Sequence, residues 1–129
     1  MERSPSPIPK KLALKPGQRF LLLDAPAGYE KELAPLPEGV TLTTKTGGKF
    51  DAIQLFATTR NCLEEGLSKA KASLNPGGMV WVTYPKGTSK IKSEINRDSI
   101  RAHVLTIGFD TVALVAIDDD WSAIRLKAV

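Results

Sequence analysis

The stretch Leu74-Asn75-Pro76-Gly77-Gly78-Met79-Val80-Trp81-Val82-Thr83-Tyr84-Pro85-Lys86 decides the fold. Before it, apolar residues from Leu63 to Leu74 recur at spacings of four, three and four, which predicts an amphipathic helix from about Arg60 to Ser73. The turn Asn75–Gly78 ends that helix, because proline cannot continue a helix and glycine adopts the backbone conformations of a turn. The apolar run from Met79 to Tyr84 then predicts a buried strand.

The rest of the chain alternates between strand and helix patterns. The continuous apolar run of 19–24 predicts a strand that is buried on both faces, and the β-branched residues of 40–44 predict a half-exposed strand near a sheet edge. We further expect a short helix at 29–33, a strand at 50–57, a helix that begins near Asn96 or Asp98 and closes at Gly108, and strands at 111–117 and 121–126. The last two strands are joined by so short a turn that they should be antiparallel.

Length and composition predict one globular domain with a tail. The chain has 129 residues, of which 42% are hydrophobic and 25% are charged, as in ordinary globular proteins. Residues 1–11 combine proline, serine and charge with little to bury, so we expect a flexible N-terminal tail there and a single domain over residues 12–129.

The sequence pattern predicts neither a membrane helix nor a signal peptide. No apolar run approaches the roughly 18 residues that a membrane helix needs, and the first residues lack the apolar core of a signal peptide. Cys62 is the single cysteine, so no intramolecular disulfide can form, and we interpret it as a structural, mostly buried thiol. The expected location is cytoplasmic, with no membrane partner.

A resemblance to class I S-adenosylmethionine-dependent methyltransferases follows from the order of these elements. The helix that ends in Leu74-Asn75-Pro76-Gly77-Gly78, the buried strand, the next helix and the final hairpin resemble the second half of that fold. The alternation predicts an α/β, three-layer, Rossmann-like open sheet that is mostly parallel. The resemblance implies the strand order 2-1-3-4-6-5 with the last strand antiparallel.

The chain after the tail also resembles a bacterial family of short proteins classed as a domain of unknown function, similar to a truncated methyltransferase-like domain. The resemblance rests on Lys15–Arg19 with Asp24–Tyr29, on Asn75–Lys86, and on Ile117–Arg125. This family implies a fold and no assigned activity.

Two features depart from the methyltransferase pattern. The loop after the first strand should carry Gly-x-Gly-x-Gly so that backbone can approach a cofactor, whereas here it holds Pro26 and one glycine, Gly28. The second strand ends in threonines and Lys45, without the acidic residue that would bind a ribose. We therefore expect no bound cofactor and no catalytic residue, and keep S-adenosylmethionine as the alternative.

Candidate ligand-binding residues gather at the carboxyl ends of the expected parallel strands, where open α/β sheets bind ligands. Arg60 and Lys86 could hold a phosphate or carboxylate, although a solvated polar loop would carry the same residues. The candidates are Asp24, Gly28, Tyr29, Arg60, Tyr84, Lys86, Asp118 and Asp119.

The run Asp118-Asp119-Asp120 has three interpretations: a cation site, a hairpin turn, or an ion pair between one aspartate and Lys86 or Arg60. Its oxygen atoms suit a hard cation such as magnesium or calcium. Aspartate also stabilises hairpin turns through its own backbone, and three successive aspartates cannot all point one way. We favour the turn and expect no metal.

The sequence favours a non-catalytic binding domain for an anionic small molecule or a protein partner at this edge. The alternative is a reduced S-adenosylmethionine-dependent methyltransferase that uses Asp24 and Asp118–Asp120 around a cofactor. A third hypothesis is nucleic-acid binding through the tail and the lysines near Lys90, which the eight aromatic residues and the net charge of +4 support poorly. The oligomeric state is left open.

Overall fold

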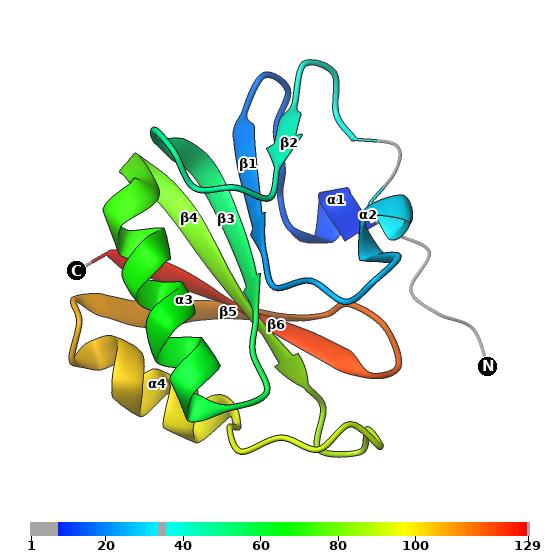
Figure 1. Cartoon of the computed structure of the whole chain (residues 1–129), viewed down its shortest axis with the longest axis vertical. Coiled ribbons are helices and arrows are strands. Elements are labelled where there is room, and N and C mark those ends of the chain that lie inside the picture. The colour runs from blue at the N-terminus through cyan, green and yellow to red at the C-terminus, as the bar shows by residue number, and fades with distance from the viewer. Residues whose placement is uncertain (1–7, 34–35, 129) are drawn as a thin grey trace.

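A six-stranded sheet flanked by helices on both faces forms the core of the computed structural model, which describes residues 8–33 and 36–128 (Figure 1). The strand order β2-β1-β3-β4-β6-β5 confirms the expected one. The first four of these strands are parallel, and β6 is antiparallel to both neighbours. The strands are β1 (Arg19–Leu23), β2 (Thr41–Thr43), β3 (Phe50–Phe56), β4 (Leu74–Pro85), β5 (Phe109–Ala116) and β6 (Trp121–Ala128), and the helices are α1 (Ile8–Lys11), α2 (Tyr29–Glu32), α3 (Arg60–Ser73) and α4 (Arg97–Leu105).

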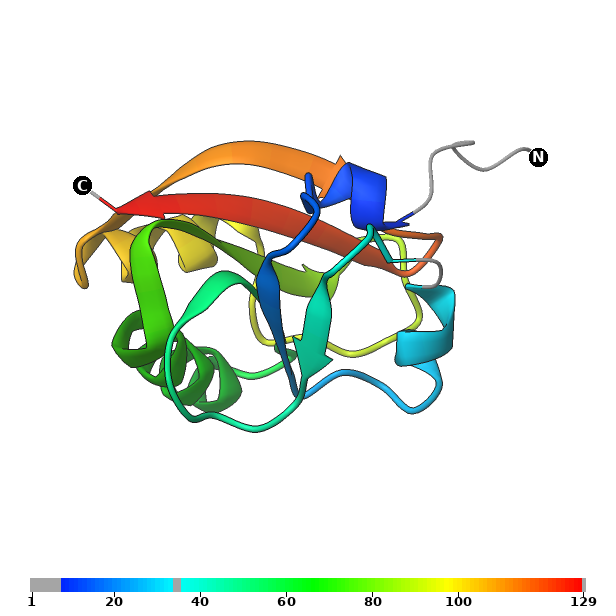
Figure 2. The same ribbon diagram turned by 90° about the horizontal axis from the view of Figure 1, so that it is seen from above.

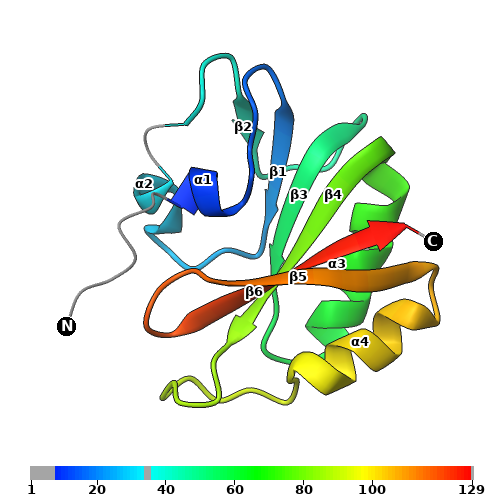
Figure 3. The ribbon, with the colours of Figure 1, turned by 180° about the vertical axis from the view of Figure 1, so that it is seen from behind.

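Two hydrophobic clusters lie on opposite faces of the sheet. The cluster beneath α3 and α4 joins Leu67 and Val104 of these helices to strand residues such as Val82. The cluster beneath α1 and α2 includes Phe20 and Trp81. α3 and α4 lie in front of the sheet in Figure 1, and α1 lies in front of it when the molecule is viewed from behind (Figure 3). The central strands β1, β3 and β4 are therefore covered on both sides, as their continuous apolar runs predict.

Residues 8–11 differ from the flexible tail that the composition predicts. They form α1, whose Ile8 is buried, and the following Leu12 is fully buried. The indole Nε1 of Trp81 donates a hydrogen bond to the Leu12 carbonyl at 3.0 Å, and Lys11 Nζ donates one to the Ile117 carbonyl at 3.2 Å. The burial of Ile8 and Leu12 offsets the entropic cost of ordering this segment. Residues 1–7 of the expected tail lie outside the described residues.

Both long helices begin at a side-chain cap. Thr59 caps α3, because its hydroxyl accepts a hydrogen bond from the Cys62 N–H. Asn96 caps α4 in a reciprocal arrangement with Ser99. These caps satisfy backbone N–H groups that have no partner inside the helix. Cys62 is exposed on α3, so the expectation of a buried thiol is wrong.

The Asn-Pro-Gly-Gly segment lies inside β4. Leu74 already pairs with Phe50 of β3, and the register then shifts before Met79 pairs with Ala52. The Asp51 carboxylate accepts hydrogen bonds from the Asn75 side chain at 3.0 Å and from the Arg19 backbone N–H at 2.9 Å. The motif therefore ties β4 to β3 and β1 at the amino-terminal end of the sheet. No helix in the described part of the chain is long and apolar enough to span a membrane.

The close packing around Gly78 predicts a large effect of one added methyl group. A Cβ atom there would lie 2.7 Å from Leu74 Cδ1 and 2.9 Å from the carbonyl oxygens of Asn75 and Asp51. We expect Gly78→Ala to lower the free energy of unfolding by about 1–3 kcal/mol, because the neighbouring backbone cannot yield easily. Urea titration would measure it. Gly87→Ala is the control, since nothing lies within 4 Å of its added Cβ, and equal losses in the two variants would contradict the prediction.

Candidate functional site

A cavity opens at the carboxyl end of β1, where the strand order reverses. β1 lies between β2 and β3, and the chain crosses from one side of β1 to the other between them. Ligands bind at this position in open α/β sheets. The cavity has a volume of about 240 Å³ and is lined by Leu22, Asp24, Ala25, Pro26, Ala27, Gly28, Glu30 and Thr44.

The loop that forms this cavity turns through two left-handed backbone positions. Asp24 has φ 57° and Gly28 has φ 86°. Aspartate is among the few residues other than glycine that adopt this conformation readily. A Cβ atom added at Gly28 would meet nothing within 4 Å, so its α-carbon faces open space. The loop thus exposes backbone at Gly28 although it has one glycine.

A chain of buried polar side chains lies beneath the loop. The Tyr29 hydroxyl donates to Gln54 Oε1 at 3.0 Å, and Gln54 Nε2 donates to Thr83 Oγ1 at 2.9 Å. Tyr29 is 3% exposed, and Gln54 and Thr83 are 0% exposed. Since a buried amide is costly unless it is hydrogen-bonded, this chain fixes α2 to β3 and β4.

Aromatic contacts extend the support from α2 to β6. The Tyr29 ring meets Phe56 edge-on at a centroid distance of 4.6 Å, and Phe56 meets Trp121 edge-on at 5.0 Å. Burial raises the pKa of Tyr29 well above its usual value. The Tyr29 hydroxyl therefore stays protonated and serves as a structural donor.

The structure brings together only some of the residues expected at a ligand site. Asp24 and Gly28 line the cavity at β1. Tyr29 lies under it with its side chain directed to Gln54. Arg60 lines a different cavity with Glu94, between α3 and α4.

Tyr84 and Lys86 mark the end of β4 and the loop after it. Tyr84 is 7% exposed and belongs to the cluster beneath α3 and α4, and burial raises the pKa of its hydroxyl. The Lys86 N–H donates to the Asp120 carbonyl at 2.8 Å, and Ser89 Oγ bonds the Asp120 carboxylate at 3.0 Å. These bonds hold the loop against the β5–β6 turn.

The aspartate run stabilises that turn. Asp118 Oδ1 accepts hydrogen bonds from the backbone N–H groups of Asp120 at 2.8 Å and Trp121 at 2.9 Å. Asp119 is exposed. Within residues 8–33 and 36–128, no three His, Cys, Asp or Glu side chains are grouped closely enough to hold a metal ion.

Sequence reasoning missed three residues of this site. Glu30 and Thr44 line the cavity, and Gln54 anchors the polar chain beneath it. Gln54 carried a signal, because it is a lone amide among the apolar residues of the 50–57 strand. Thr44 carried no such signal, because it reaches the cavity only through the pairing of β2 with β1.

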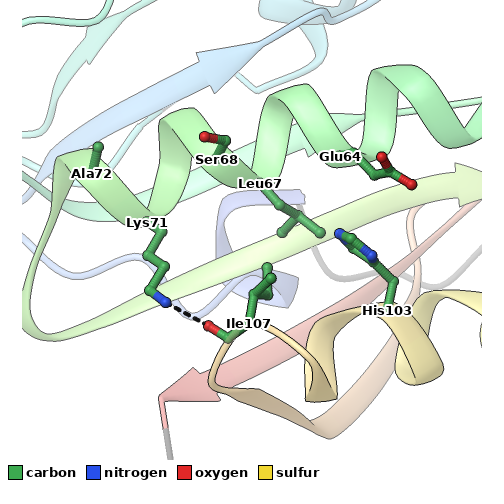
Figure 4. Close-up of a pocket in the computed structure, with 7 residues that line it drawn as sticks. All are labelled: Glu64, Leu67, Ser68, Lys71, Ala72, His103 and Ile107. Carbon is green, nitrogen blue, oxygen red and sulfur yellow. Dashed lines mark hydrogen bonds between the residues drawn. The ribbon is translucent and has the colours of Figure 1, made fainter.

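A second cavity lies between α3 and α4 and has a volume of about 430 Å³ (Figure 4). Lys71 of α3 closes one end by donating from Nζ to the Ile107 carbonyl at 2.7 Å. Glu64 and His103 point toward one another from the two helices. This cavity lies on a helix-covered face of the sheet, away from the loop that follows β1.

Comparison with known proteins supports the fold assignment. No family model and no curated protein sequence matches the chain. The DhpI–SAH complex is similar, with a TM-score of 0.66 and 10% identity over 95% of this chain and 82% of that chain. A ribosomal protein L11 methylase from Lactobacillus delbrueckii subsp. bulgaricus gives a TM-score of 0.62 at 12% identity over 94% and 74% of the chains. The glycopeptide N-methyltransferase MtfA complexed with SAM gives 0.60 at 11% identity over 95% and 86%.

The fold is therefore methyltransferase-like and Rossmann-like. The comparisons contradict the expectation of a non-catalytic binding domain that is not an enzyme and has no cofactor. The similar structures include methyltransferases, and two of them hold SAH or SAM. The expectation relied on the missing glycines of the first loop, whereas Asp24 supplies a left-handed position that a glycine would otherwise provide.

The buried polar chain predicts different effects of the same change at the two tyrosines. Tyr29→Phe leaves Gln54 Oε1 without its donor, so we expect a loss of about 1–3 kcal/mol in the free energy of unfolding. Tyr84→Phe is the matched control, because the Tyr84 hydroxyl has no hydrogen bond to other described residues, and its change should be within about 0.5 kcal/mol. Chemical denaturation measures both variants. A neutral Tyr29→Phe would show that the chain is dispensable.

Alkaline pH should weaken the fold through the same tyrosines. Burial raises the pKa of both Tyr29 and Tyr84, the two tyrosines of the chain. Their stabilising contribution is complete below the unfolded pKa of about 10 and is lost as pH rises through the folded values. Absorbance of tyrosinate should thus appear late and together with unfolding. Titration of both tyrosines near pH 10 in the folded protein would contradict this.

Proposed function

We propose that this chain binds S-adenosylmethionine in the cavity at the carboxyl end of β1 and acts as a methyltransferase of reduced size. The proposal is carried by one observation, the cavity at the order reversal of the sheet, rimmed by Asp24 and Glu30 and open at Gly28. The methyltransferases of similar fold give it independent support.

The donor set of the cavity suits a cofactor that is cationic and rich in hydroxyl groups. Carboxylates of Asp24 and Glu30 would accept hydrogen bonds from an ammonium group or from ribose hydroxyls, and Thr44 offers a hydroxyl at the end of β2. The exposed α-carbon of Gly28 lets a ligand approach the backbone. The residues present therefore fit the cofactor without the acidic residue that usually ends the second strand.

The size of the cavity limits what it encloses. Its volume of about 240 Å³ is below the roughly 300–1,000 Å³ of most small-molecule pockets. It would hold part of the cofactor, and the remainder would lie along the open edge. When bound, S-adenosylmethionine supplies an electrophilic methyl group on a sulfonium, which an acceptor nucleophile takes up.

The chain's own residues would act by positioning. The buried hydrogen bonds that link Tyr29 to Gln54, and Gln54 to Thr83, hold α2 in place beneath the loop. The loop with Asp24 and Gly28 would therefore be ordered before the cofactor binds, and binding would not bear the entropic cost of ordering it. The motifs shared with the short bacterial proteins lead us to include this chain in that family as part of the same proposal.

Calorimetric titration with S-adenosylmethionine tests the proposal. We expect saturable binding to the wild-type chain, and about 10- to 100-fold weaker binding to Asp24→Asn, because a hydrogen bond to a charged group contributes roughly 1.5–3 kcal/mol. Asp119→Asn is the matched control, since Asp119 is an exposed aspartate that does not line this cavity. The cofactor should also raise the thermal unfolding temperature of the wild-type chain and of Asp119→Asn more than that of Asp24→Asn.

Two results would overturn the assignment. Absence of heat and of thermal protection at about millimolar cofactor, where binding would be weaker than about 4 kcal/mol, would exclude the cofactor. Equal weakening by Asp24→Asn and Asp119→Asn would place binding elsewhere.

A further inference from the structure

A further cavity, with a volume of about 830 Å³, lies where β4 begins, β5 begins and β6 ends. Figure 2 shows these three strand ends on one side of the molecule. Because β4, β3 and β1 are parallel, the beginning of β4 marks the amino-terminal end of the sheet, whereas the cavity at Asp24 lies at the carboxyl end. The volume is within the roughly 300–1,000 Å³ of most small-molecule pockets.

Apolar side chains line this cavity from both faces of the sheet. Leu74, Phe109 and Leu126 belong to the cluster beneath α3 and α4 or pack against it, whereas Met79 belongs to the cluster beneath α1 and α2. Val112 lies where the register of β5 to β6 shifts, and it is 52% exposed. The cavity therefore wraps around the end of the sheet and contains apolar surface that a ligand could cover.

The Asn-Pro-Gly-Gly segment forms one wall of the cavity. Residues 75–78 lie between the Leu74–Phe50 and Met79–Ala52 pairs, so four residues of β4 oppose Asp51 alone. Gly77 is exposed, its φ is 79°, and nothing lies within 4 Å of a Cβ atom added there. Irregular strand pairing of this kind is common beside binding sites. The motif thus exposes backbone to the cavity in addition to joining β4 to β3.

The charged side chains that line the cavity are all basic, and they are Lys71, Arg125 and Lys127. Arg125 and Lys127 are two residues apart on β6, so their side chains project from the same face of the sheet. Lys71 Nζ donates to the Ile107 carbonyl at 2.7 Å, which leaves two of the three N–H donors of its ammonium group for a ligand. The cavity therefore carries positive charge from α3 and from β6.

No carboxylate within the described residues neutralises the two cations of β6. Asp110 is paired with Lys127 in the strand ladder, but its carboxylate bonds Arg101 Nε at 3.3 Å and does not line the cavity. This is the one ion pair among residues 8–33 and 36–128. Arg125 and Lys127 thus have no ion-pair partner in the described part of the chain.

We propose that this cavity binds a small organic anion, with its apolar body against the walls of the cavity and its anionic headgroup beside Arg125 and Lys127. Both parts are required, because a bare anion would leave the apolar walls exposed and a neutral apolar molecule would leave the cations unpaired. Nucleic acid fits less well, because the aromatic side chain of the cavity, Phe109, is 3% exposed and cannot stack on a base.

NMR titration with octanoate tests the proposal, and acetate and 1-octanol are the probes that carry only its headgroup or only its chain. Octanoate should shift the amide signals of Gly77 and Lys127 saturably and leave that of Gly28, at the other end of the sheet, in place. Acetate should bind at least about tenfold more weakly because it lacks the chain. 1-Octanol should bind about 3- to 10-fold more weakly because it lacks the charge.

A double variant tests the role of the two cations. Arg125→Gln with Lys127→Gln should weaken octanoate binding about 3- to 10-fold and change 1-octanol binding by less than about twofold. Arg97→Gln with Lys92→Gln is the matched control, since it removes the same charge from exposed residues that do not line the cavity. The control should change octanoate binding by less than about twofold.

Three results would overturn the proposal. They are an absence of saturable shifts at Gly77 and Lys127, binding of acetate as tight as that of octanoate, and equal weakening by the two double variants. Octanoate shifts at Gly28 alone would likewise place the ligand in the cavity at β1. Failure of S-adenosylmethionine to bind leaves this inference unaffected, because the two cavities share no lining residue.

Discussion

The hydrogen bonds of one buried amide, Gln54, connect α2 to the central strands β3 and β4. An amide in a fully buried strand position must find both a donor and an acceptor, or its burial costs several kcal/mol. Tyr29 and Thr83 meet these two requirements from α2 and β4. Because the three bonded residues belong to three different elements, α2 and β4 must keep a fixed distance from β3. The loop between β1 and α2 inherits its shape from this requirement.

The loop between β1 and α2 keeps an open cavity although the elements that follow β1 are short. The helix that follows β1, α2, has only four residues, and no helix separates β2 from β3. The rim still bends because Asp24 and Gly28 adopt left-handed backbone conformations. Glycine avoids backbone strain at a positive φ, and Gly28 meets this condition at φ 86° with open space beside its α-carbon. The number of glycines in a loop is therefore a weaker guide to its function than its backbone angles.

Much of the fold could be predicted because its signals are local. The spacing of Leu63, Leu67 and Leu74 gave the long helix, and the continuous apolar run after Gly78 gave the central strand. The site was harder, because its members meet only through sheet pairing. Arg60 and Asp24 both follow a strand, yet they line separate cavities. The composition of residues 8–11 predicted a flexible tail, but the segment forms a helical turn. Two apolar side chains and the hydrogen bond from Trp81 to the Leu12 carbonyl anchor it.

The anchoring of α1 has a consequence for the order of folding during synthesis. Leu12 bonds a side chain 69 residues later, and Lys11 bonds a carbonyl 106 residues later. The ribosome makes residues 8–12 well before either partner exists, so this segment cannot dock while the first half of the chain emerges. The complete set of these contacts can form only after the β5–β6 turn has been made, because Ile117 immediately precedes it. The full stabilisation of α1 therefore depends on contacts between residues that are far apart in the sequence, which form slowly in folding.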